Sequence, residues 1–243
     1  MNLELFIARR IAHNGSGNRP GVMVRIAVVA VALSVTVMIL ALAVIMGFKR
    51  EITDRVTGFS AQVEVADLRS AGSIESVPVL RSEQLERTIR SAGEVVRLTP
   101  YAVKGGVVKT PDAILGVMLK GVDGGYEWSF FRDHLLEGEL PRVGDSIRTK
   151  EILISRSVAR EMGLAPGDKV EMLFVESEKS PRRDRFKVSG IYATGMDEFD
   201  RSVAMTDLRN VQRLADWSSE EVSGYEVTLA DFLQAEDFSR RLN

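Results

Sequence analysis

The chain has 243 residues, a formal net charge of −2 and no cysteine. A chain of this length can bury a sizeable core, and the absence of cysteine excludes disulfides, thiolate zinc sites and cysteine nucleophiles. The near-neutral charge offers no basic surface of the kind that neutralises a phosphate backbone, which argues against nucleic acid as the main partner.

The first 21 residues are predicted to form a short surface helix followed by a connector. Apolar residues recur on one helical face: Leu3, Phe6, Ile7 and Ile11. Arg9 and Arg10 point toward another face, an arrangement typical of a helix that lies in the cytoplasmic membrane interface against anionic lipid. A solvated amphipathic helix packed on the protein itself is the alternative interpretation. The sequence HNGSGNRPG, residues 13–21, is rich in turn-forming residues and indicates the connector.

An uninterrupted apolar stretch runs from Ile26 to Phe48 without a charged residue. At 1.5 Å per residue, a helix of this length reaches roughly 35 Å, enough to cross a hydrocarbon core of about 30 Å with some tilt. Its aliphatic residues favour insertion by roughly 4 to 8 kcal/mol. The following segment, KREITDRVTGF, keeps helical spacing, so residues 22–59 are predicted to form one transmembrane helix with a rigid stalk.

Two other interpretations of this stretch are less favoured. A cleaved signal peptide would need its site at Ala41 to Ala43, but that site lies inside the apolar run and leaves too long an N-terminal region. A buried helix of a soluble protein usually has a polar face, and this stretch has none. Four positive residues precede the stretch, Arg9, Arg10, Arg19 and Arg25, and three follow it, Lys49, Arg50 and Arg55. This excess of one positive residue favours a cytoplasmic N-terminus.

Residues 60–243 alternate strand and helix patterns, which predicts an α+β domain. Strands are expected in AQVEV, YAVKGGVVKT, AILGVMLKGV, EILIS and GYEVTLA, and helices in SEQLERTIRSAG, RSVAREMG, MTDLRNVQRLA and DFLQAEDFSRRLN. Ser82 is expected to cap the first of these helices, while Gly93 and Gly163 end the first and second. KVEMLFVE and RFKVSGIYAT are expected to form a hairpin. The last helix has no evident cap, so we expect the chain to continue in a longer protein.

The sequence contains no motif for catalysis or cofactor binding. It lacks a Walker A pattern, a dinucleotide-binding glycine pattern and a G-x-S-x-G elbow. The carboxylates in GMDEFDRS, at Asp197, Glu198 and Asp200, lack EF-hand spacing and are expected to form a solvated loop. His13 and His134 fall on opposite sides of the predicted span and cannot share a metal ion. We therefore expect no catalytic residue, metal ion or cofactor, and ATP binding only on another subunit.

The segment ESEKSPRRDR, Glu176 to Arg185, lies between the predicted hairpin arms and is dense in charge. Pro181 opposes a regular strand, so a loop is predicted. A solvated tip is one interpretation of this loop. The other is a protruding recognition element in which Arg182 and Arg183 anchor a partner.

Four motifs are distinctive when taken together: FIARR near the N-terminus, the helix exit VIMGFKREITDRVTGFSAQVEV, then ILISRSVAREMGLAPGDKV and RFKVSGIYATGMDEFDRSVAMTDLRNVQRL. They resemble the permease subunits of the lipoprotein-releasing ABC transporter, the LolC and LolE family, which is FtsX-like and MacB-like. The resemblance covers nearly the whole chain. It implies an α+β fold in which one N-terminal transmembrane helix precedes a MacB-like periplasmic core domain, with three further transmembrane helices beyond the present sequence.

The resemblance also implies a function and partners. In this family a separate cytoplasmic ATPase, LolD, drives by mechanotransmission the transfer of lipoproteins from the inner membrane to the periplasmic carrier LolA. The implied partners are a LolD-like ATPase, a second permease copy or paralogue, the lipoprotein, a LolA-like carrier and membrane lipid. The implied location is the inner membrane, with the N-terminus cytoplasmic and the main domain periplasmic.

Two sets of site residues follow from the resemblance. The outer end of the first helix contributes to the family's lipoprotein cavity, which corresponds here to Val44, Ile45, Met46 and Phe48. The family's carrier-binding hook corresponds to the loop that holds Ser180, Pro181, Arg182 and Arg183. LolC-like and LolE-like roles, and homodimer and heterodimer, stay open. The alternatives are a MacB-like or FtsX-like permease with another substrate or a periplasmic hydrolase to regulate, and a membrane-anchored binding or sensor ectodomain.

Overall fold

The structure is a computed structural model that describes residues 3–4, 6–7, 10, 20–59, 61–70, 76–110, 113–144, 146–176 and 179–242. The chain forms two compact units, Met1–Asp54 and Arg55–Asn243, each with its own architecture. The boundaries predicted from the sequence, 1–21, 22–59 and 60–243, stay predictions.

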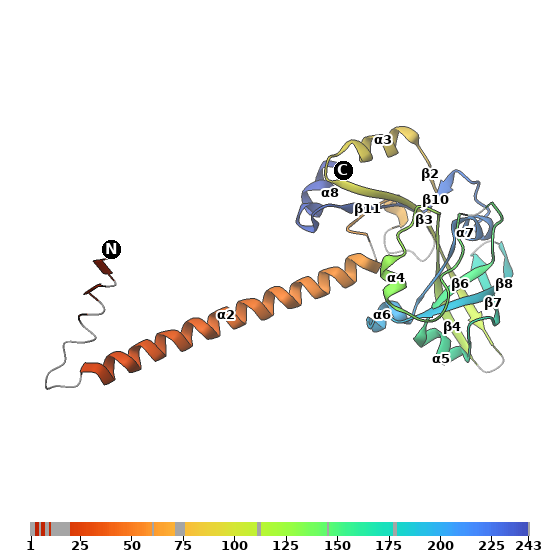
Figure 1. Cartoon of the computed structure of the whole chain (residues 1–243). Coiled ribbons are helices and arrows are strands. Elements are labelled where there is room, and N and C mark those ends of the chain that lie inside the picture. Colours follow the sequence, from red (N-terminus) through yellow and green to blue (C-terminus); the bar gives the residue numbers. More distant parts are fainter. Residues whose placement is uncertain are drawn as a thin grey trace. The chain divides into compact units, whose positions relative to one another are not determined.

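Helix α2, Pro20–Phe59, dominates the N-terminal part (Figure 1). Its stretch Gly21–Phe48 is long and apolar enough to cross a membrane, and it is exposed along its length. The hydroxyl groups of Ser34 and Thr36 donate to the carbonyl oxygens four residues earlier, at 2.9 and 2.8 Å. These bonds satisfy polar groups that would be costly in hydrocarbon. The predicted long apolar helix is confirmed, and its composition suits a membrane.

The described residues before α2, namely Leu3, Glu4, Phe6, Ile7 and Arg10, are helical, in agreement with the predicted surface helix. Most of the predicted connector, including His13, lies outside the described residues.

A nine-stranded sheet forms the centre of the second unit (Figure 1). Its strands are β1 Val63–Ala66, β3 Val95–Lys109, β4 Ile114–Val122, β5 Leu135–Gly138, β6 Glu151–Ser155, β7 Lys169–Glu176, β8 Lys179–Tyr192, β9 Val203–Asp207 and β11 Gly224–Leu229. The order is β1-β11-β3-β4-β9-β6-β8-β5, and β7 pairs with both β3 and β8. Strands β2 Val79–Leu80 and β10 Glu221–Val222 pair with each other.

The strand pairings close part of this sheet into a ring. Strand β3 pairs with β4, β4 with β9, β9 with β6, β6 with β8, β8 with β7, and β7 returns to β3. The pairs β4–β9 and β6–β8 are parallel. Closure removes the free edges of these six strands. Strands β11 and β1 extend the sheet from β3, and β5 extends it from β8.

Short helices connect the strands. They are α3 Glu83–Ser91, α4 Ser129–Asp133, α5 Arg156–Met162, α6 Asp197–Asp200, α7 Leu208–Leu214 and α8 Ala235–Leu242, with 3-10 turns η1 Leu68–Ser70 and η2 Phe232–Gln234. Ser82 caps α3, since its hydroxyl accepts from the Leu85 N–H at 3.3 Å. Gly163 ends α5 with φ +64°, a left-handed conformation that favours glycine. Both agree with the sequence predictions, but α3 ends at Ser91 and has Ala92, not Gly93, as its C-cap.

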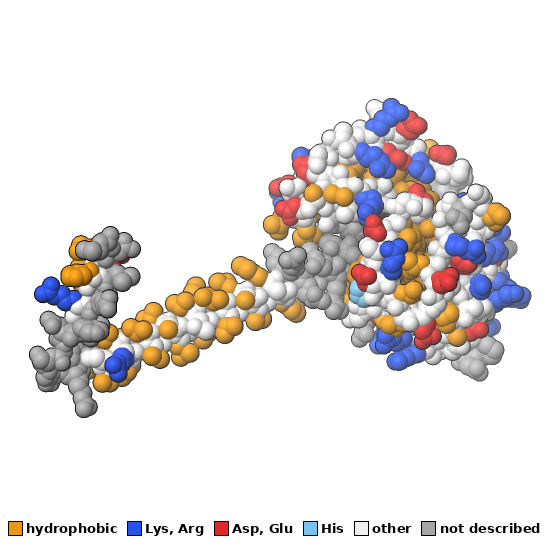
Figure 2. Space-filling model, in the orientation of Figure 1, with side chains coloured by type: hydrophobic (Ala, Val, Ile, Leu, Met, Phe, Trp, Pro, Cys, Tyr) orange, Lys and Arg blue, Asp and Glu red, His pale blue; other side chains and the backbone are white. Residues whose placement is uncertain are grey.

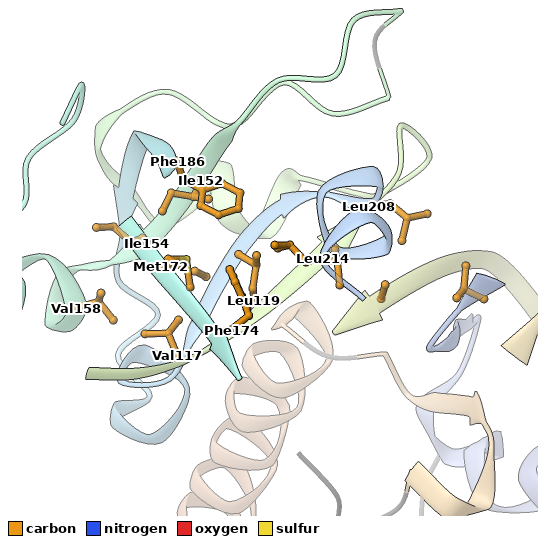
Figure 3. Packing of buried hydrophobic residues seen from close by; sticks show 14 of the residues in the cluster. Val117, Leu119, Ile152, Ile154, Val158, Met172, Phe174, Phe186, Leu208 and Leu214 are labelled. Carbon is orange, nitrogen blue, oxygen red and sulfur yellow. The ribbon is translucent and has the colours of Figure 1, made fainter. Parts of the chain in front are cut away.

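Two hydrophobic clusters stabilise the second unit. The larger includes Leu119, Met172 and Phe174 of the ring strands, whose labelled side chains lie together (Figure 3), and it extends to β1, β11, α3 and α8. Helix α7 packs against β4 so closely that a Cβ on Gly121 would lie 2.8 Å from the Cα of Leu208. The second cluster is aromatic: Phe131 meets Tyr192 edge to face, with ring centroids 5.0 Å apart. The clusters hold both strand and helix positions fixed, so the exposed faces described below are preformed.

Candidate partner-binding and membrane-facing sites

The charged segment Glu176–Arg185 is mostly strand, since all but residues 177–178 belong to β7 or β8, and this corrects the predicted loop. Strand β8 begins at Lys179, and Lys179 pairs with Glu176, so only residues 177–178 separate the strands; these two lie outside the described residues. The register shifts between Phe174 and Glu176, opposite the part of β8 that holds Pro181. A proline is tolerated at such an irregularity because no regular ladder hydrogen bond is needed there.

The two predicted anchor arginines have different environments. Arg182 is tied to the end of α7: its Nη1 donates to the Arg213 carbonyl oxygen at 3.1 Å, and its Nη2 pairs with Asp216. Arg183 is 73% exposed, and its Nη1 lies 3.7 Å from Glu171 Oε1. Arg183 can therefore reach a partner at little structural cost, whereas Arg182 already stabilises the fold.

Arg183 belongs to a larger cationic surface that we call the hairpin face. It consists of Lys169, Glu171 and Leu173 on β7 and Arg183, Arg185 and Lys187 on β8. Lys169 and Lys187 lie directly opposite each other, an unfavourable arrangement for like charges. Glu171 is shared by both arginines, with Arg185 Nε at 3.5 Å. The face thus carries four cations and one carboxylate, and it suits an acidic partner.

Sequence reasoning found Arg183 but missed the rest of this face. The signal was available in the alternation of Arg183, Arg185 and Lys187, because strand side chains two residues apart share a face. A predicted loop has no regular alternation of side chains, so the shared face was not predicted.

Asp184 holds the hairpin on its inner side. Its carboxylate is 7% exposed and accepts hydrogen bonds from Lys150, Arg213 and the Arg185 N–H. Burial opposes ionisation, but the Lys150 hydrogen bond, the backbone N–H and the Arg213 guanidinium together hold the pKa of Asp184 below its usual value. This network joins β8 to α7 and fixes the position of the hairpin face.

The predicted membrane-facing residues lie at the end of the apolar stretch of α2. Val44, Ile45, Met46 and Phe48 are between 62% and 68% exposed. Val44 and Phe48 are four residues apart and share a helical face. Figure 2 shows hydrophobic side chains along this helix and charged side chains over the second unit. The four residues thus offer an apolar surface of the kind that contacts acyl chains, with Met46 as its adaptable member.

The acidic segment of residues 197–200 is not wholly solvated, in contrast to the prediction. Asp200 is buried, and its carboxylate accepts from the Thr194 hydroxyl at 2.8 Å and from the Gly195 N–H at 3.2 Å. Its role is to lock a loop. Among the residues that the structure describes, no group of three or more ligating side chains could hold a metal ion. His134 stacks on Phe130, and its Nδ1 lies 2.8 Å from the Phe130 carbonyl oxygen.

A family model, the MacB-like periplasmic core domain, matches residues 26–243. The chain belongs to this family. The predicted fold class, one N-terminal apolar helix followed by a MacB-like α+β core domain, is thereby confirmed.

Known relatives of this MacB-like chain include the lipoprotein-releasing system transmembrane protein LolC of Xylella fastidiosa strain 9a5c, 27% identical over 212 residues, or 83% of this chain and 48% of the relative. LolC of Neisseria meningitidis serogroup B is 26% identical over 201 residues, or 78% and 45%. The chain spans about half the length of the curated relatives it matches. These relatives agree with the resemblance seen in the sequence.

Two solved structures are also similar. The extracellular domain of the noncanonic ABC-type transporter YknZ from Gram-positive bacteria is 14% identical, with a TM-score of 0.45 over 72% of this chain and 85% of that chain. The periplasmic region of MacB from Actinobacillus actinomycetemcomitans is 14% identical, with a TM-score of 0.47 over 74% and 79%.

In this MacB-like domain, β1 is tied to the sheet by side chains as well as by its ladder. Glu64 on β1 lies directly opposite Glu226 on β11. Lys120 on β4 reaches Glu226 at 2.5 Å, and the Tyr101 hydroxyl on β3 donates to Glu64. Burial and the Glu226 carboxylate raise the pKa of Glu64, with Lys120 opposing them. The first strand after α2 is thus bonded directly to β11 and β3, and it is linked to β4 through Glu226.

Proposed function

We propose that the chain is part of a permease subunit of an ABC transporter that extracts lipoproteins from the inner membrane and passes them to a periplasmic carrier. The observation that carries this proposal is the similarity to LolC over most of the chain, together with the match to the MacB-like periplasmic core domain. ATP hydrolysis takes place on a separate cytoplasmic subunit, and a second permease copy or paralogue completes the membrane part.

In this proposal the end of the apolar stretch of α2 faces the cargo. Val44, Ile45, Met46 and Phe48 contact the acyl chains of the lipoprotein, supported by their exposure and apolar character. The proposed orientation, with the N-terminus in the cytoplasm and the core domain in the periplasm, is supported by the excess of one positive residue before the apolar stretch.

Force is transmitted through α2 into the core domain. Helix α2 continues past the apolar stretch to Phe59, and β1 begins four residues later at Val63. A pull or rotation of the helix reaches β1 first, and the Glu64–Tyr101 and Lys120–Glu226 contacts pass it to the central strands. A helix and a hydrogen-bonded sheet are both stiff enough for this role.

The hairpin of β7 and β8 binds the carrier. Ser180 and Pro181 lie near the hairpin tip, and Arg183 extends from the exposed hairpin face. Arg182 supports the hairpin through α7 and contributes less to binding. The cationic surplus of the face attracts an acidic patch on the carrier and accelerates encounter at low salt.

The test is site-specific photocross-linking in the full-length permease, bound to its ATPase and partner subunit and reconstituted in lipid. A photoreactive side chain at Met46 is expected to capture lipoprotein, while one at Val29, 17 residues earlier on α2, captures lipid. At Arg183 it is expected to capture the carrier, while at the exposed Arg87 on α3 it does not. If Met46 captures only phospholipid while release proceeds normally, the cavity assignment is wrong. If the photoreactive side chain at Arg183 captures no carrier, the hairpin is not the carrier-binding site.

A further inference from the structure

A groove of about 400 Å³ lies between helix α5 and the edge strand β5. Its apolar lining residues include Ala159 on α5, Ile191 on β8 and Leu136 on β5. Arg156 and Arg160 line the α5 side, and Glu137 lines the β5 side. The volume falls within the range of sites that bind small ligands or peptide side chains.

The backbone holds both walls of this groove in place. Ser155 caps α5, since its hydroxyl accepts from the Val158 N–H at 3.1 Å. On the other wall, the Glu139 N–H donates to the Ser189 carbonyl oxygen at 2.8 Å. The chain at the end of β5 approaches β8 so closely that a Cβ on Gly190 would lie 3.0 Å from the Glu137 carbonyl oxygen and 2.5 Å from that of Glu139, just after the strand. A groove with fixed walls loses little conformational freedom when it binds a ligand.

The positive charges of the groove are not neutralised internally. Arg156 and Arg160 are four residues apart, so they share a helical face and repel each other. Within the described part of the chain, neither guanidinium forms a hydrogen bond or an ion pair, and Glu137 does not pair with them. An arginine fork matches a carboxylate through two parallel hydrogen bonds. The two arginines of the α5 wall therefore have no anionic partner among the described residues, and a ligand with carboxylates can supply one.

The opposite wall offers an open sheet edge. Strand β5 pairs with β8 on one side and is the last strand in the sheet order, so no described strand covers its other side. Leu136 is 45% exposed there. Backbone groups along such an edge are free to pair with an extended chain.

We propose that this groove binds an extended acidic segment of a partner protein. Carboxylates of the segment pair with Arg156 and Arg160, and its apolar side chains contact Leu136 and Ile191. The unneutralised arginines select an acidic segment, and the open edge selects an extended one. Ile191 is eight residues along β8 from Arg183, or about 26 Å at 3.3 Å per residue. The groove is thus separate from the hairpin face and can be occupied while that face is engaged.

The test is a peptide titration on the full chain in nanodiscs of phosphatidylcholine. The probe is a fluorescent peptide of alternating valine and glutamate, and its counterpart has glutamine in place of glutamate. We expect the glutamate peptide to bind at least about 10-fold more tightly, because two charge-assisted contacts distinguish it. In a chain that also carries R183Q/R185Q, which weakens peptide binding at the hairpin face, the double variant R156Q/R160Q should lose this preference. The matched variant R87Q/R201Q, which removes two exposed arginines elsewhere, should keep it, and so should R183Q/R185Q on the hairpin face.

Each other outcome overturns the proposal. If the two peptides bind with equal affinity, or if R156Q/R160Q in the R183Q/R185Q chain still prefers the glutamate peptide, the groove does not bind an acidic segment. Loss of the preference in R183Q/R185Q instead would assign it to the hairpin face. Displacement of the peptide by millimolar inorganic phosphate, or binding abolished in phosphatidylglycerol nanodiscs, would assign the arginines to a free anion or to a lipid headgroup. Dimerisation of the chain that R156Q/R160Q abolishes would assign the groove to a second copy. Circular dichroism and thermal melting confirm that each variant is folded.

Discussion

Replacing Asp184 with asparagine tests the network that positions the hairpin face. The carboxylate is buried and accepts from Lys150, Arg213 and the Arg185 N–H. Hydrogen bonds to charged groups contribute about 1.5–3 kcal/mol each, but Lys150 and Arg213 are half-exposed and turn to water when the charge is lost. We therefore expect D184N to lower the free energy of unfolding by about 2 kcal/mol, and the melting temperature by about 4–8 °C for a domain of this size.

The assay is thermal unfolding of the full chain in detergent, followed by tryptophan fluorescence. Both tryptophans, Trp128 and Trp217, lie in the second unit, so the signal reports on that unit. E171Q is the control, since Glu171 is more exposed and should change stability by less than about 1 kcal/mol.

The pH dependence of D184N gives a second readout. The pKa of Asp184 is lowered in the folded protein, so its contribution is complete above its ordinary value of 3.8 and disappears as the pH falls through the folded value. The gap between wild type and D184N should therefore be constant from pH 7 to pH 5 and narrow below about pH 3.8. Equal melting temperatures at pH 7, or a gap that persists unchanged in acid, would refute the reasoning.

Three further predictions address other parts of the molecule. G190A should destabilise the second unit by about 2–3 kcal/mol in denaturant unfolding, because the new methyl group would meet the Glu139 carbonyl oxygen at 2.5 Å; a wild-type midpoint would contradict the close approach. The pKa of Glu64 is raised in the folded protein, so the free energy of unfolding of the wild type should fall as the pH rises from 4.5 through this raised pKa. E64Q should lack this fall and be at least as stable as the wild type at pH 7; identical pH profiles of the two proteins would contradict the prediction. L40R should impair membrane insertion by about 3–4 kcal/mol in a glycosylation-based insertion assay, because arginine is costly and the favourable leucine is lost; undiminished insertion would argue against the span.

Elements with local signals were predictable from the sequence. The apolar run of α2, the glycine that ends α5 and the serine that caps α3 depend on neighbouring residues alone. Strand β7 was also predicted with its observed bounds, because turn residues precede it and alternating apolar residues fill it.

Elements that depend on distant contacts were not predictable. The closure of the ring by β3 and β7 pairs residues about 65 positions apart, for example Val107 with Leu173. Strand β9 was merged into the helix that follows, although Asp207 caps that helix and marks the junction. The sequence predicts a loop for the first part of β8 because Pro181 and high charge are typical of loops, yet the exposed side of this strand lies on the outside of the ring and tolerates charge.

The candidate sites were predictable to different degrees. The resemblance indicates Arg182 and Arg183 as site residues. It does not indicate that Arg182 supports the fold while Arg183 stays exposed, because this difference depends on the end of α7, where Arg182 forms its hydrogen bonds. The groove on α5 was not predictable, because Arg156 and Arg160 become one wall of a site only when β5 lies opposite them.

The most direct test of the account is lipoprotein release in proteoliposomes that contain the full-length permease, its partner subunit and its ATPase. With fluorescent triacylated lipoprotein in the membrane and purified carrier outside, we predict ATP-dependent transfer of the lipoprotein to the carrier, reduced by R183E/R185E and unchanged by R87E/R201E. Active ATP hydrolysis without any lipoprotein transfer would contradict the proposed function and favour a MacB-like permease with another substrate.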